Sequence, residues 1–319
     1  MKPLSKGKVI IGMSGGVDSS TAAYLLKEEG YEVIGVTMGM WQEPGETEGC
    51  GNLSAVKDAS RVAEKLGIEF HVLDFRKEFR ENVVDYFINS YERGMTPNPC
   101  IACNRHVKWA ALLDYANKIE ADYIATGHYS MIEYSEKYGQ YVLRKSNEEK
   151  KDQSYFLYTI PKERLKSIIF PLQNYNSKEE IRKIAEKNNF EVATKKDSQE
   201  ICFIPDNCYQ NFLEKKMENK IKEGNIILKT GEILGKHKGL INYTIGQRKG
   251  IGVSYKEPLY VIELRSDTNE VVVGVEKELY SSKLIADNVN WQVDLNERGL
   301  ECFAKIRYRA KEAKAKVYK

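Results

Sequence analysis

Short apolar runs alternate with stretches of helical periodicity through the first half of the chain. Four of these runs predict buried strands, over Val9–Met13, Val33–Met38, Ile68–Leu73 and Tyr123–Thr126. The stretches between and after them carry apolar positions three and four residues apart and predict helices over Ser19–Glu29, Ser54–Leu66, Lys77–Glu92, Asn104–Ile119, Lys162–Ile169 and Ser177–Asn188. Strand–helix alternation of this kind is typical of an α/β fold with a doubly wound, mostly parallel sheet.

The pattern changes after Pro205. Glycine-rich turns there separate short β-like runs such as Ile226–Leu228, Leu259–Leu264 and Val271–Val275. We therefore expect three domains: an α/β domain over residues 1–205, a small central domain over 206–264, and a partial C-terminal β-barrel domain over 265–319.

Composition narrows the class of protein. With 319 residues, of which 42% are hydrophobic and 30% charged, the chain is typical of a folded protein with two or three domains. No apolar run approaches the roughly eighteen residues of a membrane span, and the N-terminal apolar stretch is too short for a secretion signal. The six cysteines therefore indicate cytosolic thiols, and we expect a cytoplasmic protein. Net charge is only +3, but basic residues gather in Lys305–Lys319, as binding to phosphate groups would require.

A glycine-rich turn joins the first predicted strand to the first predicted helix. It reads GMSGGVDS from Gly12 to Ser19. Its central glycines let the backbone fold closely around an anion, toward which the amides at the start of a helix point. Ser14 and Ser19 add hydroxyl donors, and the carboxylate of Asp18 suits Mg²⁺. The turn is neither a Walker loop nor a dinucleotide fingerprint, and the bland alternative is an ordinary tight turn.

Three cysteines carry the second chemical signal. Cys100 and Cys103 are separated by two residues in a proline-rich loop before a predicted helix, and Cys202 lies far downstream. A helix dipole stabilises a thiolate near the helix N-terminus, so we expect Cys103 to be reactive. Three interpretations stay open from the residues alone: inert buried thiols, a zinc or iron–sulfur site, and a pair in which one cysteine carries sulfur and the other displaces it.

Several strings together resemble one family. They include GMSGGVDSS, TPNPCIACN, ATGHYS, KDQSYFL, DSQEICFIP, GKHKGLINYTIGQRKGIG and IRYR, and they run nearly from end to end. This ordered set resembles the bacterial tRNA-specific 2-thiouridylases, which belong to the PP-loop ATP pyrophosphatases. The resemblance implies an enzyme that uses ATP to replace the C2 oxygen of the wobble uridine (position 34) with sulfur in the tRNAs for Lys, Glu and Gln. It also implies that a cysteine desulfurase or a sulfur-relay protein supplies the sulfur.

The resemblance assigns roles to residues that match the family motifs. Cys103 matches the catalytic nucleophile and Cys202 the residue that carries a persulfide, and a disulfide between them would follow sulfur transfer. The residues expected to bind ATP, with Mg²⁺ on Asp18, are Gly12, Met13, Ser14, Gly15, Gly16, Val17, Asp18, Ser19, Met38 and Gly127. The residues expected to contact tRNA are Asn98, Pro99, Cys100, His128, Lys151, Asp152, Gln153, Arg307 and Tyr308. Without the resemblance, His128 reads as a core histidine and Lys151–Gln153 as an exposed turn.

Two features depart from the family pattern. Many relatives have an aspartate, thought to act as an acid or base, where this chain has Cys100. A cysteine there leaves that role open and strengthens the alternative in which Cys100, Cys103 and Cys202 hold a 4Fe-4S cluster that delivers sulfide. Relatives also continue past Arg307-Tyr308 with further strands, so we expect the C-terminal β domain to be truncated. Two rival functions stay open: a PP-loop ligase for a small molecule, and a tRNA-binding protein without catalysis.

Overall fold

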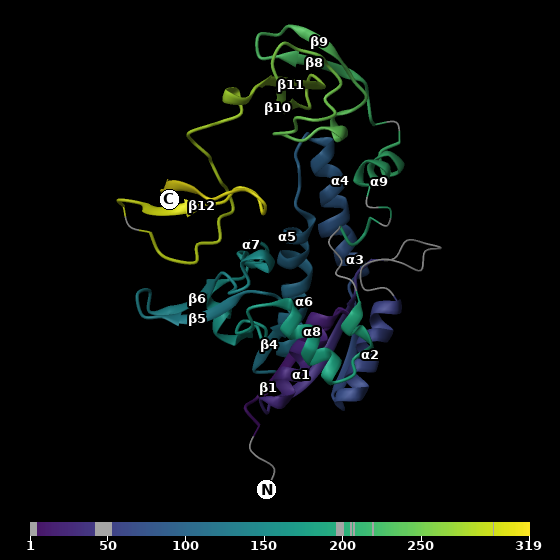
Figure 1. Cartoon of the computed structure of the whole chain (residues 1–319), viewed down its shortest axis with the longest axis vertical. Helices are drawn as coiled ribbons and strands as arrows, with labels where there is room; N and C mark the ends of the chain where they lie inside the picture. The colour runs from purple at the N-terminus through teal and green to yellow at the C-terminus, as the bar shows by residue number, and fades with distance from the viewer. Residues whose placement is uncertain are drawn as a thin grey trace.

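The computed structural model comprises an α/β domain, a small β domain and a C-terminal hairpin (Figure 1). It describes residues 5–41, 53–195, 201–204, 206, 208–218, 220–295 and 297–319. The α/β domain occupies the lower half of Figure 1 and the central domain the top. In the part of the chain that is described, no helix is both long and apolar enough to cross a membrane.

The α/β domain is built on a five-stranded sheet in the order β3-β2-β1-β4-β7. Its strands are β1 (Lys8–Gly12), β2 (Glu32–Gly39), β3 (Glu69–Asp74), β4 (Tyr123–Thr126) and β7 (Ile168–Ile169), and every pair is parallel. The chain runs outward from β1 through β2 to β3 and then returns to β4 on the other side of β1. This reversal creates a switch point beyond the carboxyl ends of β1 and β4. The predicted doubly wound parallel sheet is confirmed.

Helices cover both faces of the sheet because successive strand residues point to opposite sides. Val9 and Ile11 of β1 pack in a core with α1 (Val17–Glu28), α2 (Leu53–Leu66) and α8 (Lys178–Lys187). Ile10, between them, packs in a second core with α4 (Asp85–Glu92) and α6 (Trp109–Lys118). All three β1 side chains are fully buried. Burial on both faces explains why the strands read as continuous apolar runs.

Two predicted helices are less regular than expected. The first consists of α3 (Arg76–Phe79), the π-helical turn η1 (Arg80–Val84) and α4. The second begins five residues early, as α5 (Pro99–Cys103), and continues through the π-helical turn η2 (Asn104–Lys108) into α6. The early start has a local cause, because the Asn98 side chain caps the helix by accepting a hydrogen bond from the Ile101 amide at 3.3 Å, and Pro99 occupies the first helical position.

The prediction of one helix over Lys162–Ile169 is wrong at its end. The structure has a 3₁₀ helix, η4 (Lys162–Ser167), followed by strand β7. Ile168 pairs with Ile124 of β4, so Ile168 and Ile169 form an edge strand of the sheet. The α/β domain also contains the hairpin β5 (Met131–Ser135) and β6 (Gln140–Arg144), with the short helices η3 (Glu149–Lys151), α7 (Ser154–Leu157) and η5 (Glu191–Thr194).

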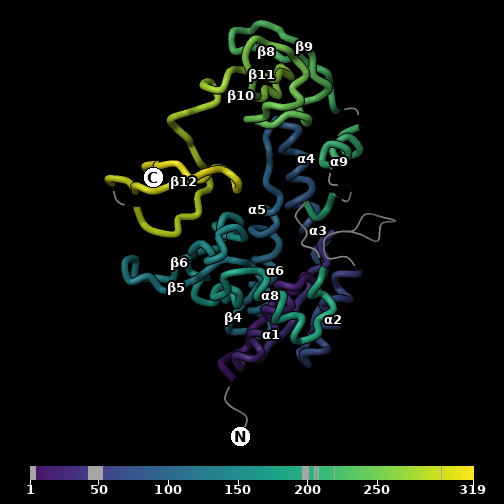
Figure 2. Tube along the Cα trace, in the orientation of Figure 1, coloured from purple at the N-terminus to yellow at the C-terminus, as the bar shows by residue number. Residues whose placement is uncertain are grey.

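The central domain holds a four-stranded sheet in the order β10-β11-β8-β9. Its elements are α9 (Tyr209–Lys216), β8 (Gly224–Leu228), β9 (Ile233–His237), η6 (Leu240–Asn242), β10 (Leu259–Arg265), β11 (Glu270–Val275) and η7 (Glu276–Glu278). A boundary at residue 264, as expected from the sequence, would separate β10 from its hydrogen-bonded partner β11. The domain sits at the far end of α4 (Figure 2). There Tyr91 stacks on Tyr209 with ring centroids 5.2 Å apart.

The C-terminal region forms a two-stranded hairpin, β12 (Leu300–Ala304) and β13 (Ala313–Val317). Its approach segment is fixed to the α/β domain by Asn290, whose side-chain amide donates to the Tyr158 and Ile160 carbonyls, each at 2.7 Å. Phe303 and Ile306 are exposed, so the hairpin has no closed core of its own in the residues described.

Candidate active site

The glycine loop, defined as Gly12–Ser19, connects β1 to α1 at the switch point of the sheet. Gly15 has a φ of +69°, and a Cβ placed on it would lie 2.4 Å from the carbonyl oxygen of Ala55 in α2. Both the backbone angle and this close approach require glycine. The Met13 amide donates to the Val36 carbonyl at 2.8 Å, which fixes the start of the loop on the neighbouring strand.

Hydrogen bonds tie the glycine loop to the first turn of α1. The Ser14 amide donates to the Ser19 hydroxyl oxygen at 3.1 Å, and the Ser20 hydroxyl donates to the Gly16 carbonyl at 2.9 Å. Gly16 is the N-cap of α1, so no side chain caps the first amides of this twelve-residue helix. Uncapped amides together with the helix dipole favour an anion at this position.

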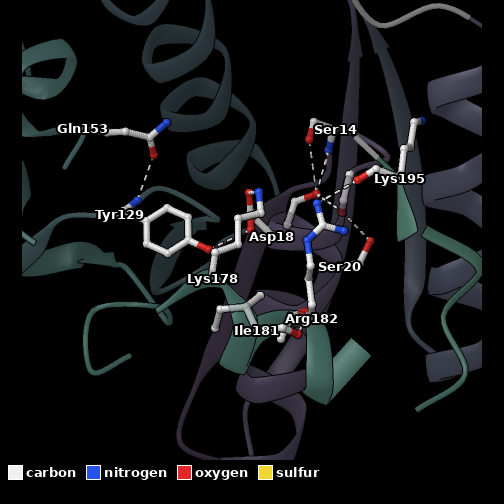
Figure 3. Close-up of polar contacts among 12 residues, drawn as sticks. Ser14, Asp18, Ser20, Tyr129, Gln153, Lys178, Ile181, Arg182 and Lys195 are labelled. Carbon is white, nitrogen blue, oxygen red and sulfur yellow. Dashed lines mark hydrogen bonds and ion pairs between the residues drawn. The ribbon is translucent and has the colours of Figure 1, made fainter. Parts of the chain in front are cut away.

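Asp18 is held by two residues that the sequence did not indicate (Figure 3). The Lys178 ammonium group lies 2.8 Å from Asp18 Oδ2, and the Tyr129 hydroxyl donates to Asp18 Oδ1 at 2.8 Å. Lys178 is the first residue of α8 and is only 8% exposed. This ammonium group neutralises the Asp18 carboxylate, which would otherwise repel an anion at the loop.

The segment leading to Cys202 also touches the glycine loop. Lys195 Nζ donates to the Gly15 carbonyl at 3.1 Å and forms an ion pair with Asp58 of α2 at 2.7 Å. Residues 197–200 and 205 of the DSQEICFIP string lie outside the described residues.

Met38 and Gly127, expected near the adenosine, lie at the same edge of the sheet as the glycine loop. Met38 is buried near the end of β2, and Gly127 directly follows β4. A Cβ on Gly127 would lie 2.7 Å from the Ser19 amide nitrogen. Glycine at this position therefore lets the end of β4 rest against the first turn of α1.

Cys103, which the sequence predicts to be reactive, is buried in the structure. It is the fifth residue of its helix rather than the first, it is 5% exposed, and its Sγ lies 3.9 Å from the Sδ of Met40. Burial raises the pKa of Cys103 to about 12, although the Lys108 ammonium acts in the opposite direction. Desolvation outweighs the attraction of the Lys108 charge, so in this conformation the residue is a neutral thiol.

Cys100 and Cys202 are exposed and share the surroundings of Cys103. Although the residue as a whole is exposed, desolvation raises the pKa of the Cys100 thiol, and the charge of Lys108 partly opposes this rise. Negative charge on Cys202 raises the pKa of both Cys100 and Cys103, which shows that the three sulfurs interact. Even so, within the described ranges no three His, Cys, Asp or Glu side chains are grouped so that they could hold a metal ion.

His128 lies at the same edge, next to the helix that carries Cys103. Its Nδ1 is 2.8 Å from the Thr126 hydroxyl, and its ring stacks on Trp109 with centroids 6.4 Å apart. Burial, assisted by the charge of Lys108, lowers the pKa of His128 to about 3. The imidazole is thus neutral near pH 7 and offers stacking and one hydrogen-bonding edge rather than positive charge.

The predicted tRNA contacts Lys151–Gln153 have structural partners. Asp152 Oδ1 accepts hydrogen bonds from the Ser146 amide at 2.9 Å and the Ser154 amide at 3.3 Å, so this carboxylate organises the start of α7. Gln153 Oε1 accepts from the Tyr129 amide at 2.9 Å. The side chains of Asp152 and Gln153 therefore fix the backbone segment that leads into α7.

The structure brings Arg307 and Tyr308 to this same segment. The Tyr308 ring lies 4.6 Å from the ring of Phe156 in α7, centroid to centroid. Arg307 donates to the Ile245 carbonyl of the central domain at 2.8 Å. Asn104, directly after Cys103, donates to the Phe156 carbonyl at 2.9 Å. Three segments far apart in sequence thus meet around α7.

Known proteins resemble this chain over nearly its whole length. Two family models match, one described as the tRNA methyl transferase HUP domain over residues 7–206 and one as the tRNA methyl transferase PRC-barrel domain over residues 210–275. The tRNA-specific 2-thiouridylase MnmA of Clostridioides difficile strain 630 is 50% identical over 316 residues, which cover 98% of this chain and 87% of that protein. The tRNA-specific 2-thiouridylase MnmA of Clostridium perfringens strain ATCC 13124 is 50% identical over 319 residues, covering 98% and 88%.

The chain belongs to the tRNA-specific 2-thiouridylase family. The resemblance seen in the sequence motifs is confirmed. Among solved structures, a 4-thiouridine synthetase–RNA complex with bound ATP is 19% identical, with a TM-score of 0.37 over 67% of this chain and 51% of that chain. At this TM-score the likeness says nothing about function.

Two polar residues of this 2-thiouridylase family member were missed from the sequence. A lysine at the start of a helix is usually a solvated surface residue, so Lys178 gave no signal. Tyr129 directly follows Gly127-His128 and reads as an ordinary aromatic core residue. The positions of α8 and β4 around α1 bring both side chains to Asp18.

Proposed function

We propose that this tRNA sulfurtransferase uses ATP to convert the wobble uridine of the tRNAs for Lys, Glu and Gln to 2-thiouridine. The observation that carries the proposal is the placement of a preformed anion-binding loop and a cluster of thiols at one edge of one sheet. Cys103 contacts Met40 just after β2, and the glycine loop follows the adjacent strand β1. Family membership makes thiolation of a tRNA uridine the reaction that fits this placement.

Activation of the uridine is the first step. We infer that the triphosphate of ATP lies on the amides of the glycine loop, with Lys178 adding charge and Met38 and Gly127 near the adenosine. The carboxylate of Asp18 and the serine hydroxyls are hard oxygen donors that would hold Mg²⁺, which neutralises phosphate charge when bound. The uridine is extruded from the anticodon loop, and its O2 attacks the α-phosphate and releases pyrophosphate. AMP then becomes a good leaving group on C2.

Sulfur transfer is the second step, and it assigns different roles to two cysteines. The exposed Cys202 accepts a terminal sulfur from a cysteine desulfurase or a relay protein as a persulfide. That sulfur attacks C2 and displaces AMP, leaving C2 linked through two sulfurs to Cys202. The Cys103 thiolate then attacks the Cys202 sulfur, which releases 2-thiouridine and leaves a Cys103–Cys202 disulfide for a reductant. A variant route, in which Cys103 first releases sulfide from the persulfide, ends in the same disulfide.

Recognition of tRNA is proposed for the surface around α7. Its members are Asn98, Pro99, Cys100, His128, Lys151, Asp152, Gln153, Arg307 and Tyr308. The Tyr308 contact with Phe156 and the Asn104 contact with the Phe156 carbonyl support this grouping, because they connect the hairpin loop to the helix that carries Cys103. Cys100 has a raised pKa, so it would act as a neutral thiol rather than as the base that an aspartate supplies.

The test is 2-thiouridine formation on unmodified tRNA-Lys transcript, with anaerobically purified protein, ATP, Mg²⁺, cysteine and a desulfurase. We expect product from wild type, loss of more than about a hundredfold in Cys103→Ser and Cys202→Ser, and retention in Cys100→Ser. Cys302→Ser is the matched control and should stay within about twofold of wild type. Loss in all three variants together with bound iron would favour the cluster, and ATP–pyrophosphate exchange without RNA would favour a small-molecule ligase.

A further inference from the structure

Tyr129 contacts both halves of the proposed active site. It is 3% exposed, and it packs in the core formed by α1, α2 and α8. Its hydroxyl donates to Asp18 Oδ1 at 2.8 Å, in the glycine loop. Its backbone forms two hydrogen bonds with Gln153: the Tyr129 amide donates to Gln153 Oε1 at 2.9 Å, and the Gln153 amide donates to the Tyr129 carbonyl at 2.8 Å. Figure 3 shows the line from Gln153 through Tyr129 to Asp18 and Lys178.

We propose that Tyr129 is a positioning residue that couples occupancy of the nucleotide site to the tRNA-facing segment at α7. This inference rests on the proposed function, because it takes the glycine loop as the ATP site and α7 as part of the tRNA surface. It adds an energetic link between the two sites, so that each substrate alters the affinity for the other.

The nucleotide end of the link requires two arrangements, and the structure shows one of them. In it, Asp18 is engaged by Lys178 and Tyr129, each at 2.8 Å. When Asp18 turns to Mg²⁺ and Lys178 to phosphate, the carboxylate to which the Tyr129 hydroxyl donates moves, and Tyr129 must follow it or lose that hydrogen bond. The ring is buried on all sides and cannot rotate into solvent. The adjustment therefore passes to the Tyr129 backbone.

The tRNA end receives this adjustment through hydrogen bonds. The Tyr129 backbone is bonded in both directions to Gln153, which directly precedes α7. Helix α7 carries Phe156, whose ring meets Tyr308 at 4.6 Å and whose carbonyl accepts from Asn104 beside Cys103. A shift at Tyr129 would thus reach both the tRNA surface and the helix of the nucleophile through direct contacts.

The experiment measures coupling as a ratio of affinities. The probe is an ATP analogue with a methylene group between the α- and β-phosphates, bound with Mg²⁺ in the absence and presence of saturating unmodified tRNA-Lys transcript. We expect tRNA to change the analogue Kd of wild type by at least about fivefold, and the analogue to change the tRNA Kd by the same factor. Tyr129→Phe removes only the hydroxyl group, and the factor should fall below about twofold.

Tyr243→Phe is the matched control. Tyr243 is also a buried tyrosine, and its hydroxyl donates to the Ile251 carbonyl at 3.2 Å in the central domain. This variant loses a comparable hydrogen bond far from the link and should keep the wild-type coupling factor. Thermal melting of both variants shows whether the fold is retained.

A second pair of variants tests the backbone half of the link. Gln153→Glu keeps an oxygen that can accept from the Tyr129 amide, whereas Gln153→Met removes it. Both substitutions alter a proposed tRNA contact, so both lower tRNA affinity, but the ratio isolates coupling. We expect coupling to persist in Gln153→Glu and to disappear in Gln153→Met.

Two results would overturn the proposal while leaving the proposed function intact. One is thiolation-competent wild type with a coupling factor of one, and the other is an unchanged factor in both Tyr129→Phe and Gln153→Met. Wild type that binds neither the analogue nor tRNA and makes no 2-thiouridine would instead refute the proposed function, and the coupling with it.

Discussion

The glycine loop and Cys103 lie at the same edge of the sheet, but they differ in how closely their conformations match what the proposed reaction requires. The loop is fixed by its own contacts: Gly15 fits against Ala55, and Asp18 is held on both carboxylate oxygens. Cys103, by contrast, is buried as a neutral thiol with its pKa raised to about 12. One region is built for its ligand, while the other needs a change of environment before it can react.

This difference follows from the chemistry each region performs. Amides and hydroxyls are chemically inert in water, so a loop made of them can stay exposed. A rigid loop also binds phosphate without a further entropy cost for ordering the loop. A permanently exposed thiolate would be oxidised or would attack the wrong disulfide. A site that buries its nucleophile until the substrates are bound avoids both reactions. The comparison therefore predicts a site that is activated in order, nucleotide first and sulfur second.

The largest expected effect concerns alkylation of Cys103. A rise in pKa from 9.0 to about 12 lowers the thiolate fraction near neutral pH by roughly a thousandfold. In free enzyme at pH 8, iodoacetamide should therefore modify Cys103 about a thousandfold more slowly than a cysteine peptide in the same tube. Site-resolved mass spectrometry measures both rates.

Bound substrates should reduce this difference in alkylation rate between Cys103 and the peptide. Adding the ATP analogue and tRNA transcript should accelerate labelling of Cys103 if the site is activated by its ligands. Cys208, partly exposed at the start of α9 and outside the proposed site, serves as the internal reference for reagent access. Rapid labelling of Cys103 in the free enzyme would remove the contrast between the two regions.

The next effect concerns the rigidity of the glycine loop. Gly15→Ala introduces a Cβ 2.4 Å from the Ala55 carbonyl oxygen at a φ of +69°, and relief requires the loop to move. We expect a loss of about 3 kcal/mol of stability from strain and overpacking, and roughly thirtyfold weaker binding of the ATP analogue. Calorimetry and equilibrium binding measure the two changes.

Gly139→Ala provides the matched control. Gly139 lies in the turn of the β5–β6 hairpin with a φ of +62°, but a Cβ there would meet nothing within 4 Å. The substitution carries the same backbone strain without the clash, so it should cost about 1 kcal/mol and leave analogue affinity unchanged. Equal losses of affinity in the two variants would show that the loop is not preformed for its ligand.

The smallest effect concerns the pH dependence of stability from His128. Burial lowers the pKa of His128 to about 3, so between pH 6.5 and 3 the unfolded chain binds a proton that the folded chain excludes. Stability from this residue is therefore present above pH 6.5 and falls with pH below it, by about 1.4 kcal/mol at pH 5.5. His128→Gln should lose that much less stability than wild type between pH 8 and 5.5 in urea unfolding. Equal losses of stability in wild type and His128→Gln would show that His128 is exposed to solvent rather than packed against Trp109.

Much of the fold and part of the site could be predicted from local sequence. Buried parallel strands are continuous apolar runs, so β1 and β2 were found near their true ends. The strand β7 was missed because two isoleucines after a helical pattern have no strand signal until β4 pairs with them. The burial of Cys103 was missed because a residue's distance from water depends on neighbours such as Met40, which is more than sixty residues away.

The sequence by itself determined the doubly wound sheet, the glycine loop with its anion-binding geometry, and the motifs that identify the family. These features follow from residues adjacent along the chain, where spacing and backbone preference are sufficient. The tertiary structure alone decided that Lys178 and Tyr129 hold Asp18, that Cys103 is a buried neutral thiol, and that Tyr308 meets α7. Such properties arise from side chains brought together across 60 to 160 positions, and electrostatic and desolvation energies depend on distance in space rather than along the chain.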